Sequence, residues 1–122
     1  MVNKKEMIYD GRAKQVFATD DPGLAIIHYK DNASAYKGLK TGTIEGKGIV
    51  NNRISNHLMR VLERNGIETH VVEQISDRET LVRRVEIIPV PLVVRNIAAG
   101  SLARRIGYAE GTRLKSTIVT VL

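Results

Sequence analysis

The 122-residue sequence contains no cysteine and no tryptophan. Without thiols the chain can form neither a disulfide nor a thiolate metal site, and it has no cysteine nucleophile. This composition suits the cytoplasm, where we expect the protein to act. Long apolar runs are also missing, since none approaches the roughly 20 residues that a membrane-spanning helix needs. The basic N-terminus, MVNKKEMIYDG, lacks the apolar stretch of a secretory signal.

Acidic residues are outnumbered by basic ones, 13 against 19, which gives a formal net charge of +6. A surplus of this size favours anionic partners, of which nucleic acid is only one. The basic residues are spread along the chain, aromatic content is 4%, and no RNA-recognition, zinc-finger or helix-turn-helix pattern is present. We therefore expect phosphorylated small molecules, not nucleic acid, as partners.

The hydrophobic pattern predicts mostly strands. Residues 7–19 read as two strands around an Asp10-Gly11 turn, and residues 31–46 read as a polar, glycine-rich loop. Further strands are expected at 24–30, 70–76, 81–88, 91–96 and 116–122. Because most connections are too short for parallel crossovers, we expect an α+β fold, a mainly antiparallel sheet with flanking helices.

A helical period begins at about Gly48 and stops at Asn65-Gly66. Its apolar residues fall at i, i+4, i+8, i+11 and i+12 and draw one stripe: Val50, Ile54, Leu58, Val61 and Leu62. A second, short helix is expected over residues 101–106. The chain stops on the apolar run STIVTVL, so we expect more protein normally to follow.

The stretch VVRNIAAGSLARRIG, residues 93–107, places an arginine, small residues and a hydroxyl at one strand-to-helix corner. Arg95 can present a two-pronged guanidinium to a carboxylate or phosphate. The run from Ala98 to Gly100 lets backbone N–H groups approach an anion, and Ser101 adds a hydroxyl at a helix start. The alternative is that the small residues only permit close packing and that Ser101 is an ordinary N-cap.

Several stretches, taken in chain order, resemble the N-terminal half of one enzyme family. They are MIYDGRAKQVFATDDP, GTIEGKGIVNNRISN, ISDRETLVRRVEIIPV and RNIAAGSLARRIGYAEGT, and the most characteristic stretch is IPVPLVVRNIAAGS. On these residues the sequence is similar to SAICAR synthetase, the phosphoribosylaminoimidazole-succinocarboxamide synthase of purine biosynthesis. The resemblance implies a single nucleotide-binding lobe over 1–122. Within it, about 1–90 would form the antiparallel sheet and long helix, and about 91–122 the truncated start of a second lobe.

The resemblance further implies an ATP-dependent ligase. Such enzymes join L-aspartate to the carboxylate of CAIR, a phosphorylated aminoimidazole ribotide, and give SAICAR, ADP and phosphate. Mg²⁺ offsets the charge of the triphosphate, and its ligands are expected in the half that this sequence does not match. The resemblance assigns no catalytic residue and no metal ligand to this chain, and turnover is expected to require the other half.

The resemblance also implies site residues. ATP binding would fall to a phosphate-covering hairpin and an adenine-contacting strand and linker: Gly11, Arg12, Ala13, Lys14, Val16, Val82, Val85, Glu86 and Ile87. CAIR binding would fall to Arg95, Gly100 and Ser101. The sequence departs from the family pattern at Arg12, Asn32, Lys37 and Pro91, where lysine, an acidic residue, aspartate or asparagine, and glutamate are usual.

Three hypotheses remain open from the sequence. The chain is a synthetase lobe that needs a complementary C-terminal polypeptide, or a non-catalytic nucleotide- or ribotide-binding module, which could be a homodimer. The third is a basic nucleic-acid-interacting domain that borrowed the fold. The partners expected from the first are ATP, CAIR and L-aspartate.

Overall fold

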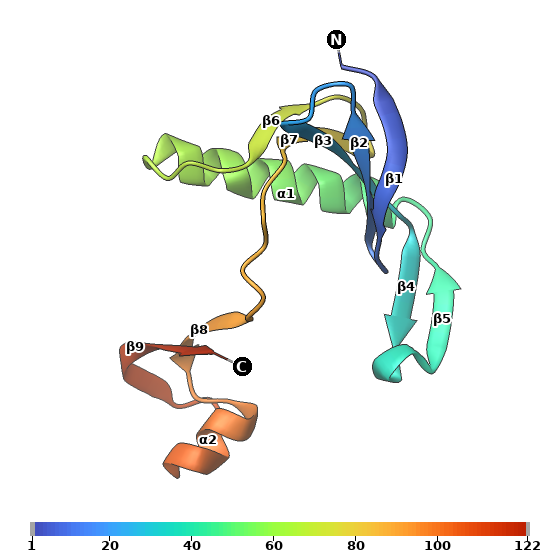
Figure 1. Cartoon of the computed structure of the whole chain (residues 1–122). Coiled ribbons are helices and arrows are strands. Elements are labelled where there is room, and N and C mark those ends of the chain that lie inside the picture. The colour runs from blue at the N-terminus through green and yellow to red at the C-terminus, as the bar shows by residue number, and fades with distance from the viewer. Residues whose placement is uncertain (1, 122) are drawn as a thin grey trace. The chain divides into compact units, whose positions relative to one another are not determined.

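The computed structural model describes residues 2–121, and the chain divides into two compact units between Val85 and Glu86. The resemblance implies a boundary between two lobes at about residue 90. The first unit contains a five-stranded antiparallel sheet in the order β1-β2-β3-β7-β6, seen in Figure 1. Its strands are β1 (Lys4–Asp10), β2 (Lys14–Thr19), β3 (Leu24–Tyr29), β6 (Val71–Gln74) and β7 (Glu79–Arg83). The predicted antiparallel α+β fold is confirmed.

A buried apolar cluster of the first unit lies on one face of this sheet, called here the core face. Alternate residues of a strand point to the same face, and on that face of β3 the side chains of Ala25, Ile27 and Tyr29 are buried. They pack with Val71 and Val82, and the partly buried Val16 and Met59 complete the cluster. Met59 belongs to helix α1 (Lys47–Arg64), which contacts β3, β6 and β7. The helix therefore covers the core face.

The side of helix α1 that packs on the sheet is not its apolar stripe. Its buried residues are Gly48, Asn52 and Asn56, spaced at i, i+4 and i+8. Val50, Ile54, Leu58, Val61 and Leu62 instead remain 36–55% exposed. The reason is that the sheet side offers polar groups: Asn52 Nδ2 donates to the carbonyls of Ser76 and Asp77 at 3.0 and 2.9 Å. A polar and small-residue stripe, not the apolar one, thus docks this helix.

Residues 31–46 are not the irregular loop expected from their composition. They form the hairpin of β4 (Asn32–Ala35) and β5 (Lys40–Thr43), joined through the 3₁₀ turn Tyr36–Gly38. Figure 1 shows this hairpin extending beyond the end of the five-stranded sheet. At its tip Tyr36 and Lys37 have positive φ angles of 52° and 55°. Asparagine and aspartate tolerate that conformation better than lysine, which gives a physical reason for the residue types that the resemblance implies at position 37.

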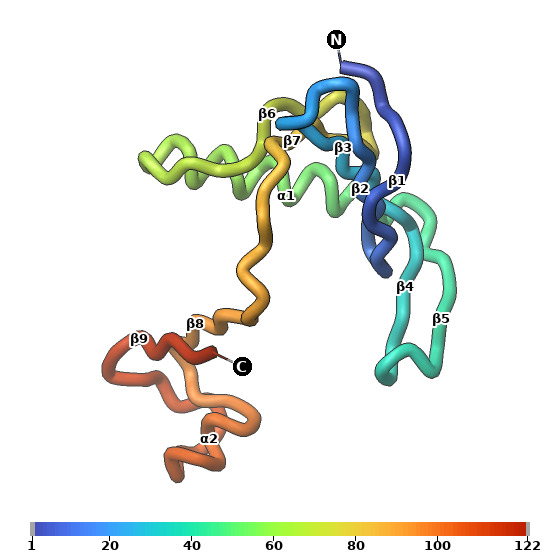
Figure 2. The backbone as a smooth tube through the Cα atoms, viewed as in Figure 1, coloured from blue at the N-terminus to red at the C-terminus, as the bar shows by residue number. Residues whose placement is uncertain are grey.

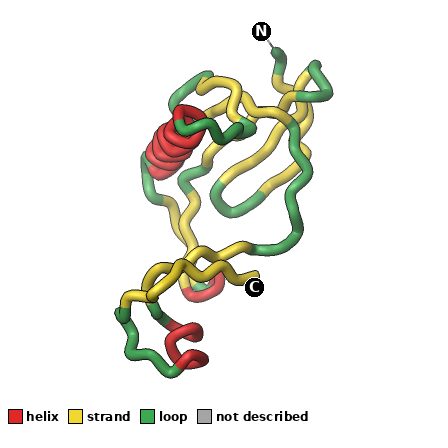
Figure 3. The backbone as a smooth tube through the Cα atoms, turned by 90° about the vertical axis from the view of Figure 1, so that its left-hand side faces the viewer, coloured by secondary structure: helices red, strands yellow, loops and turns green. Residues whose placement is uncertain are grey.

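The second unit is a two-stranded antiparallel ladder with a short helix in its connection, as the tube in Figure 2 shows. Its elements are β8 (Leu92–Ile97), α2 (Gly100–Ile106) and β9 (Arg113–Val121), and Figure 3 colours them by type. Ala98, Leu102 and Ala103 are its buried apolar residues. Pro91 lies immediately before β8, at a strand entrance, where proline is tolerated.

The predicted strands over 70–76, 81–88 and 116–122 differ from the structure at their ends. Strand β6 covers only Val71–Gln74, and β7 stops at Arg83, so that residues 84–91 have no regular secondary structure. Strand β9 begins three residues earlier than expected, at Arg113. Strand ends depend on which neighbour continues the ladder, and this is not visible in a local pattern.

Candidate functional site

The loop between β1 and β2 consists of Gly11, Arg12 and Ala13. It is one residue longer than the predicted two-residue Asp10-Gly11 turn, and Gly11 has no positive φ. A Cβ at Gly11 would come within 2.7 Å of the Tyr9 hydroxyl, so glycine here leaves space for a neighbouring ring. Lys30 holds the loop, because its backbone N–H donates to Ala13 O at 2.8 Å and its ammonium group donates to Gly11 O at 3.1 Å.

A cavity of about 460 Å³ lies beside this loop. Its wall carries two cations and several neutral polar groups and has no acidic side chain. The lining residues are Arg12, Ala13, Asn32, Ala33, Ser34, Gly38, Thr41 and Lys47. Within residues 2–121 neither Arg12 nor Lys47 forms an ion pair. Because two cations without carboxylate partners attract anions, the cavity is suited to a phosphate or carboxylate group.

The residues predicted for the phosphate-covering hairpin include Arg12 and Ala13 of this cavity, and Asn32 was noted only as a departure from the family pattern. Ser34, Thr41 and Lys47 were not predicted. These residues reach the cavity from the β4–β5 hairpin and from the first turn of α1. The Lys47 ammonium group donates to the carbonyl of Asn32 at 3.1 Å, which ties the helix start to β4. The only local signal for these residues was a polar, lysine-containing run before the predicted helix.

Asp31 fixes the start of α1 against the sheet. Its carboxylate accepts hydrogen bonds from two guanidinium nitrogens of Arg78, at 2.6 and 2.9 Å, and from the backbone N–H groups of Gly48 and Gly46, at 2.8 and 3.2 Å. The hydrogen bonds from Arg78 lower the pKa of Asp31 most, followed by the bond from the backbone N–H of Gly48. In turn, the hydrogen bonds to the Asp31 carboxylate raise the pKa of Arg78. The carboxylate also sits where a helix N-terminus favours negative charge.

The Asp31 carboxylate should make the stability of the chain depend on acidity. A folded-state pKa below the unfolded value, about 3.9, gives stability that is complete above about pH 5 and is lost as the pH falls below about 4. We expect the urea midpoint of Asp31→Asn to lie below that of the native chain at pH 7. The gap should narrow between about pH 5 and pH 3. An unchanged gap over that range would show that Asp31 does not titrate with folding.

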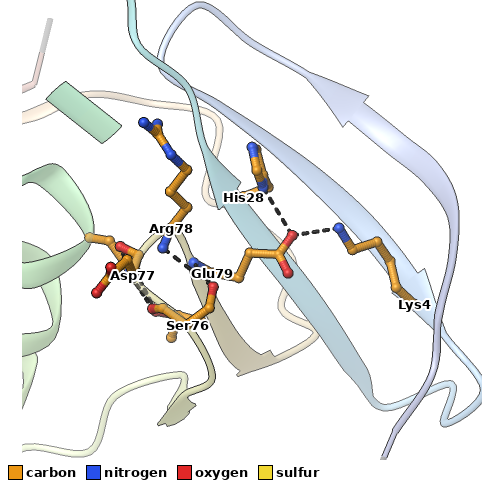
Figure 4. A network of polar contacts seen from close by, with 8 residues as sticks. Lys4, His28, Ser76, Asp77, Arg78 and Glu79 are labelled. Atoms are coloured by element: carbon orange, nitrogen blue, oxygen red, sulfur yellow. Dashed lines mark hydrogen bonds and ion pairs between the residues drawn. The ribbon is translucent and has the colours of Figure 1, made fainter. Parts of the chain in front are cut away.

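A second polar network lies on the sheet face that alternates away from α1, and Figure 4 shows it. The Glu79 carboxylate accepts a hydrogen bond from Lys4, and Nδ1 of His28 lies 2.9 Å from the same oxygen. Burial raises the pKa of Glu79, but the hydrogen bonds from Lys4 and His28 outweigh it and lower the pKa. These residues belong to β1, β3 and β7, so the network links three strands of the sheet, and none of its residues lines the cavity.

The residues expected near adenine are found in different surroundings. Val16 and Val82 meet in the core cluster, where Val82 is 4% exposed, and Val85 follows β7 with 57% of its surface exposed. Glu86 and Ile87 open the second unit, and Ile87 is 82% exposed. Lys14, the first residue of β2, lies near His70, whose pKa is lowered by burial and by the Lys14 charge.

The residues expected to bind CAIR all lie in the second unit. Arg95 is on β8, paired with Ile118 of β9, and within residues 2–121 its side chain has no hydrogen bond or ion pair. Gly100 opens α2 with a φ of 54°, and its N–H lies 3.4 Å from Glu110 Oε1. Ser101 is not the N-cap, because Ala99 holds that position and makes no side-chain capping bond. The Ser101 side chain is exposed.

Two further properties concern metals and membranes. In the described part of the chain, no three His, Cys, Asp or Glu side chains converge closely enough to hold a metal ion. None of the helices within residues 2–121 has the length and apolar character that a membrane crossing requires.

Comparisons with known proteins identify the family of this chain. The family model described as SAICAR synthetase matches residues 7–122. The phosphoribosylaminoimidazole-succinocarboxamide synthase of Chlorobium chlorochromatii (strain CaD3) is 57% identical over 118 residues, which are 97% of this chain and 50% of that protein. The enzyme of the same name from Clostridium botulinum (strain Loch Maree / Type A3) is 48% identical over 98% of this chain and 51% of its own length. The chain thus spans about half the length of the relatives it matches.

Solved structures show the same relation. The phosphoribosylaminoimidazole-succinocarboxamide synthase from Ehrlichia chaffeensis superimposes with a TM-score of 0.84 at 45% identity, covering 93% of this chain and 48% of that one. A SAICAR synthetase solved in complex with ADP gives a TM-score of 0.85 at 35% identity, covering 95% of this chain and 49% of its own. By sequence and by fold, this chain belongs to the SAICAR synthetase family.

Proposed function

We propose that this chain is the nucleotide- and ribotide-binding half of a SAICAR synthetase, which ligates L-aspartate to CAIR at the expense of ATP. The observation that carries the proposal is the family match over residues 7–122. It is joined by a cavity in which Arg12 and Lys47 face no acidic side chain. We also propose that the protein acts in the cytoplasm, as its composition suggests.

The ATP phosphates are assigned to the β1–β2 loop and the cavity beside it. Arg12 and Lys47 line that cavity, and Lys14 begins the strand after the loop. These cations neutralise phosphate charge. Lys30 anchors the loop that carries Arg12, which avoids the cost of ordering a free loop, and the bond from Lys47 to the Asn32 carbonyl holds Lys47 in place. A relative solved with ADP supports a nucleotide ligand. The adenine is assigned to Val16, Val82, Val85, Glu86 and Ile87, and Gly11 and Ala13 complete the phosphate loop.

The ribotide is assigned to Arg95, Gly100 and Ser101. The Arg95 guanidinium has no acidic partner within residues 2–121 and can bind the ribotide phosphate or carboxylate in two-pronged fashion. The exposed Ser101 hydroxyl can donate a further hydrogen bond. Gly100, at positive φ, keeps the backbone beside it free of a side chain.

The proposed reaction has two steps. A carboxylate oxygen of CAIR attacks the γ-phosphorus of ATP, which forms an acyl phosphate and releases ADP. The aspartate amine then attacks the acyl carbon, the amide C–N bond forms, and phosphate leaves while the amine loses its proton to water. The residues of this chain bind and orient the two anionic substrates and neutralise their charge. Magnesium and aspartate are assigned to the half of the family's chain that this one does not span.

The test of this proposal is a ligase assay on two proteins. One is the 122-residue chain, and the other is the same chain fused to the remaining half of the Chlorobium chlorochromatii relative. We expect the chain alone to bind ATP without turnover, and the fusion to form SAICAR. Turnover by the chain alone would contradict the need for a second half. Binding of ATP or CAIR without turnover by the fusion would favour a non-catalytic module.

Arg95→Ala is expected to weaken CAIR binding by about 1.5–3 kcal/mol, the range for a hydrogen bond to a charged group. This corresponds to a Kd raised about 10- to 150-fold, measurable by isothermal titration calorimetry. Arg104→Ala is the matched control, because Arg104 is an exposed arginine of the same unit on α2. Equal effects of the two substitutions would remove Arg95 from the ribotide site.

A further inference from the structure

The outer face of α1 presents two parallel stripes to solvent. The apolar stripe is the set of five residues described above, with Val50, Ile54 and Leu58 each more than half exposed. Beside it lies a basic stripe at i, i+4, i+7 and i+11: Arg53, His57, Arg60 and Arg64. A patch of five large apolar side chains along one helix is of the size that marks a protein-binding surface.

The apolar stripe cannot be buried by rotating the helix. The opposite side of α1 is fixed to the sheet through Asn52, Asn56 and Thr80: Asn56 donates to the Thr80 hydroxyl at 2.7 Å, and that hydroxyl donates to Asn52 Oδ1 at 2.6 Å. Turning the helix would break this buried network and leave its polar atoms unsatisfied, which is costly. The stripe must therefore be covered by something outside the first unit or stay in water.

Charge indicates what could cover it. Helix α1 carries four lysine and arginine side chains and one acidic side chain, Glu63. Two copies of this chain paired through α1 would bring like charges together, which disfavours self-association on this face. Arg60 is held rigid, since it donates to Glu63 at 2.6 Å and to the carbonyl of Val72 at 2.9 Å. A partner with an apolar core and an acidic border would match both stripes.

A shallow hollow of about 330 Å³ lies along the basic border, between α1 and β6. It is lined by Arg53, Asn56, His57, Arg60 and Gln74, with no acidic side chain among them. Arg53 has 67% of its side chain exposed and lies 3.7 Å from Asp77, so its guanidinium is available for a second partner. The hollow can receive a carboxylate from whatever seats on the apolar stripe.

We propose that the apolar stripe of α1 docks the part of the family's chain that this chain does not span, through a segment whose apolar side chains are bordered by Asp or Glu. The inference rests on the proposed function, since it takes its occupant from the relatives, which are about twice as long. The stripe then becomes the interface across which the nucleotide-binding unit is held to the rest of the synthetase.

The absence of cysteine allows a direct test. Leu58→Cys introduces a single thiol on the stripe, and its modification by a maleimide can be followed by mass spectrometry of the peptide that carries it. The rate is compared between the 122-residue chain and its fusion to the remaining half of the Chlorobium chlorochromatii relative. We expect labelling roughly 10-fold slower, or more, in the fusion, because a buried thiol is shielded from the reagent. Leu39→Cys, at an 88% exposed position of the β4–β5 hairpin, should label equally fast in both.

A second measurement uses stability. Leu58→Lys should move the thermal midpoint of the 122-residue chain by less than about 2 °C, since the side chain is already exposed. In the fusion it should lower the midpoint by about 5–15 °C, because a charge would enter a buried interface. Leu39→Lys, which makes the same chemical change, should have little effect in either protein.

Three results would overturn the inference. The first is equal labelling of the Leu58→Cys thiol in both proteins, and the second is an equal effect of Leu58→Lys in both. The third is concentration-dependent protection of that thiol in the 122-residue chain, which would identify a second copy as the occupant. Ligase turnover is measured separately on the native fusion. Protection of the thiol without turnover would contradict the proposed function and leave the docking surface in place.

Discussion

Asn52→Ala is expected to lower the free energy of unfolding of the first unit by about 3 kcal/mol. Asn52 is fully buried, and its amide donates to the carbonyls of Ser76 and Asp77. Its oxygen accepts the Thr80 hydroxyl at 2.6 Å. Removing the side chain leaves these partners buried without a hydrogen bond, at about 1–3 kcal/mol for each group that water cannot reach. Urea denaturation followed by circular dichroism measures the change.

Asn51→Ala supplies the matched control. Asn51 precedes Asn52 in the same helix, and its side chain makes no hydrogen bond within residues 2–121. Alanine has the higher helix propensity, so this variant should be neutral or slightly stabilising, within about 0.5 kcal/mol. If the two alanine variants unfolded at the same urea concentration, the buried amide network could not be what fixes α1 to the sheet.

Asn51 and Asn52 differ in burial although they are adjacent in one helix, and hydrophobic periodicity predicts the bounds of that helix better than its buried side. The 3.6-residue pattern gave α1 nearly its observed bounds, Lys47–Arg64. It could not tell which side of the helix meets the sheet, because an apolar stripe indicates only that something apolar covers it. Gly48, Asn52 and Asn56 form a second stripe of equal spacing, and a glycine aligned with two amides is a signal of close, polar packing that was available in the sequence.

The β4–β5 hairpin was missed for a different reason. The strand NASA contains no β-branched or aromatic residue, and KTGT contains only threonine of those types. Their pairing, Asn32 with Thr43 and Ala35 with Lys40, rests on a register that no local preference specifies. Because residues 31–46 were predicted to be a loop, the five of eight cavity-lining residues that this hairpin contributes could not be placed together.

The same limit applies to the candidate site. Arg12 and Ala13 could be named from the sequence because the family resemblance marks their hairpin. Ser34 and Lys47 reach the cavity only through tertiary structure. The start of α1, which carries Lys47, is fixed by the ion pair between Asp31 and Arg78, and these two residues lie 47 positions apart in the chain. A cavity wall assembled from three separate elements has no sequence motif of its own.

Gly48→Ala is expected to destabilise the first unit and to weaken ATP binding together. A Cβ at this position would lie 2.4 Å from the Tyr29 carbonyl oxygen and 2.8 Å from Nη1 of Arg78. The carbonyl belongs to a buried residue of the core and cannot move aside, so the first turn of α1 must retreat. Helix propensity alone would favour alanine by about 1 kcal/mol, but overpacking of this kind costs typically about 1–3 kcal/mol and occasionally more.

We therefore expect a net loss of about 2 kcal/mol in the free energy of unfolding. Lys47, the residue before Gly48, would be drawn away from Asn32 and from the cavity. Loss of one cation from a phosphate site should raise the Kd for ATP roughly 10-fold. Ser55→Ala, in the same helix, gives a smaller propensity gain without the clash, so it should raise the free energy of unfolding by no more than about 0.5 kcal/mol and leave the Kd for ATP unchanged. A Gly48→Ala variant that is more stable than the native chain and binds ATP normally would contradict this prediction. It would mean that a Cβ fits at the start of α1, and that Asp31 and Gly48 do not set the position of Lys47.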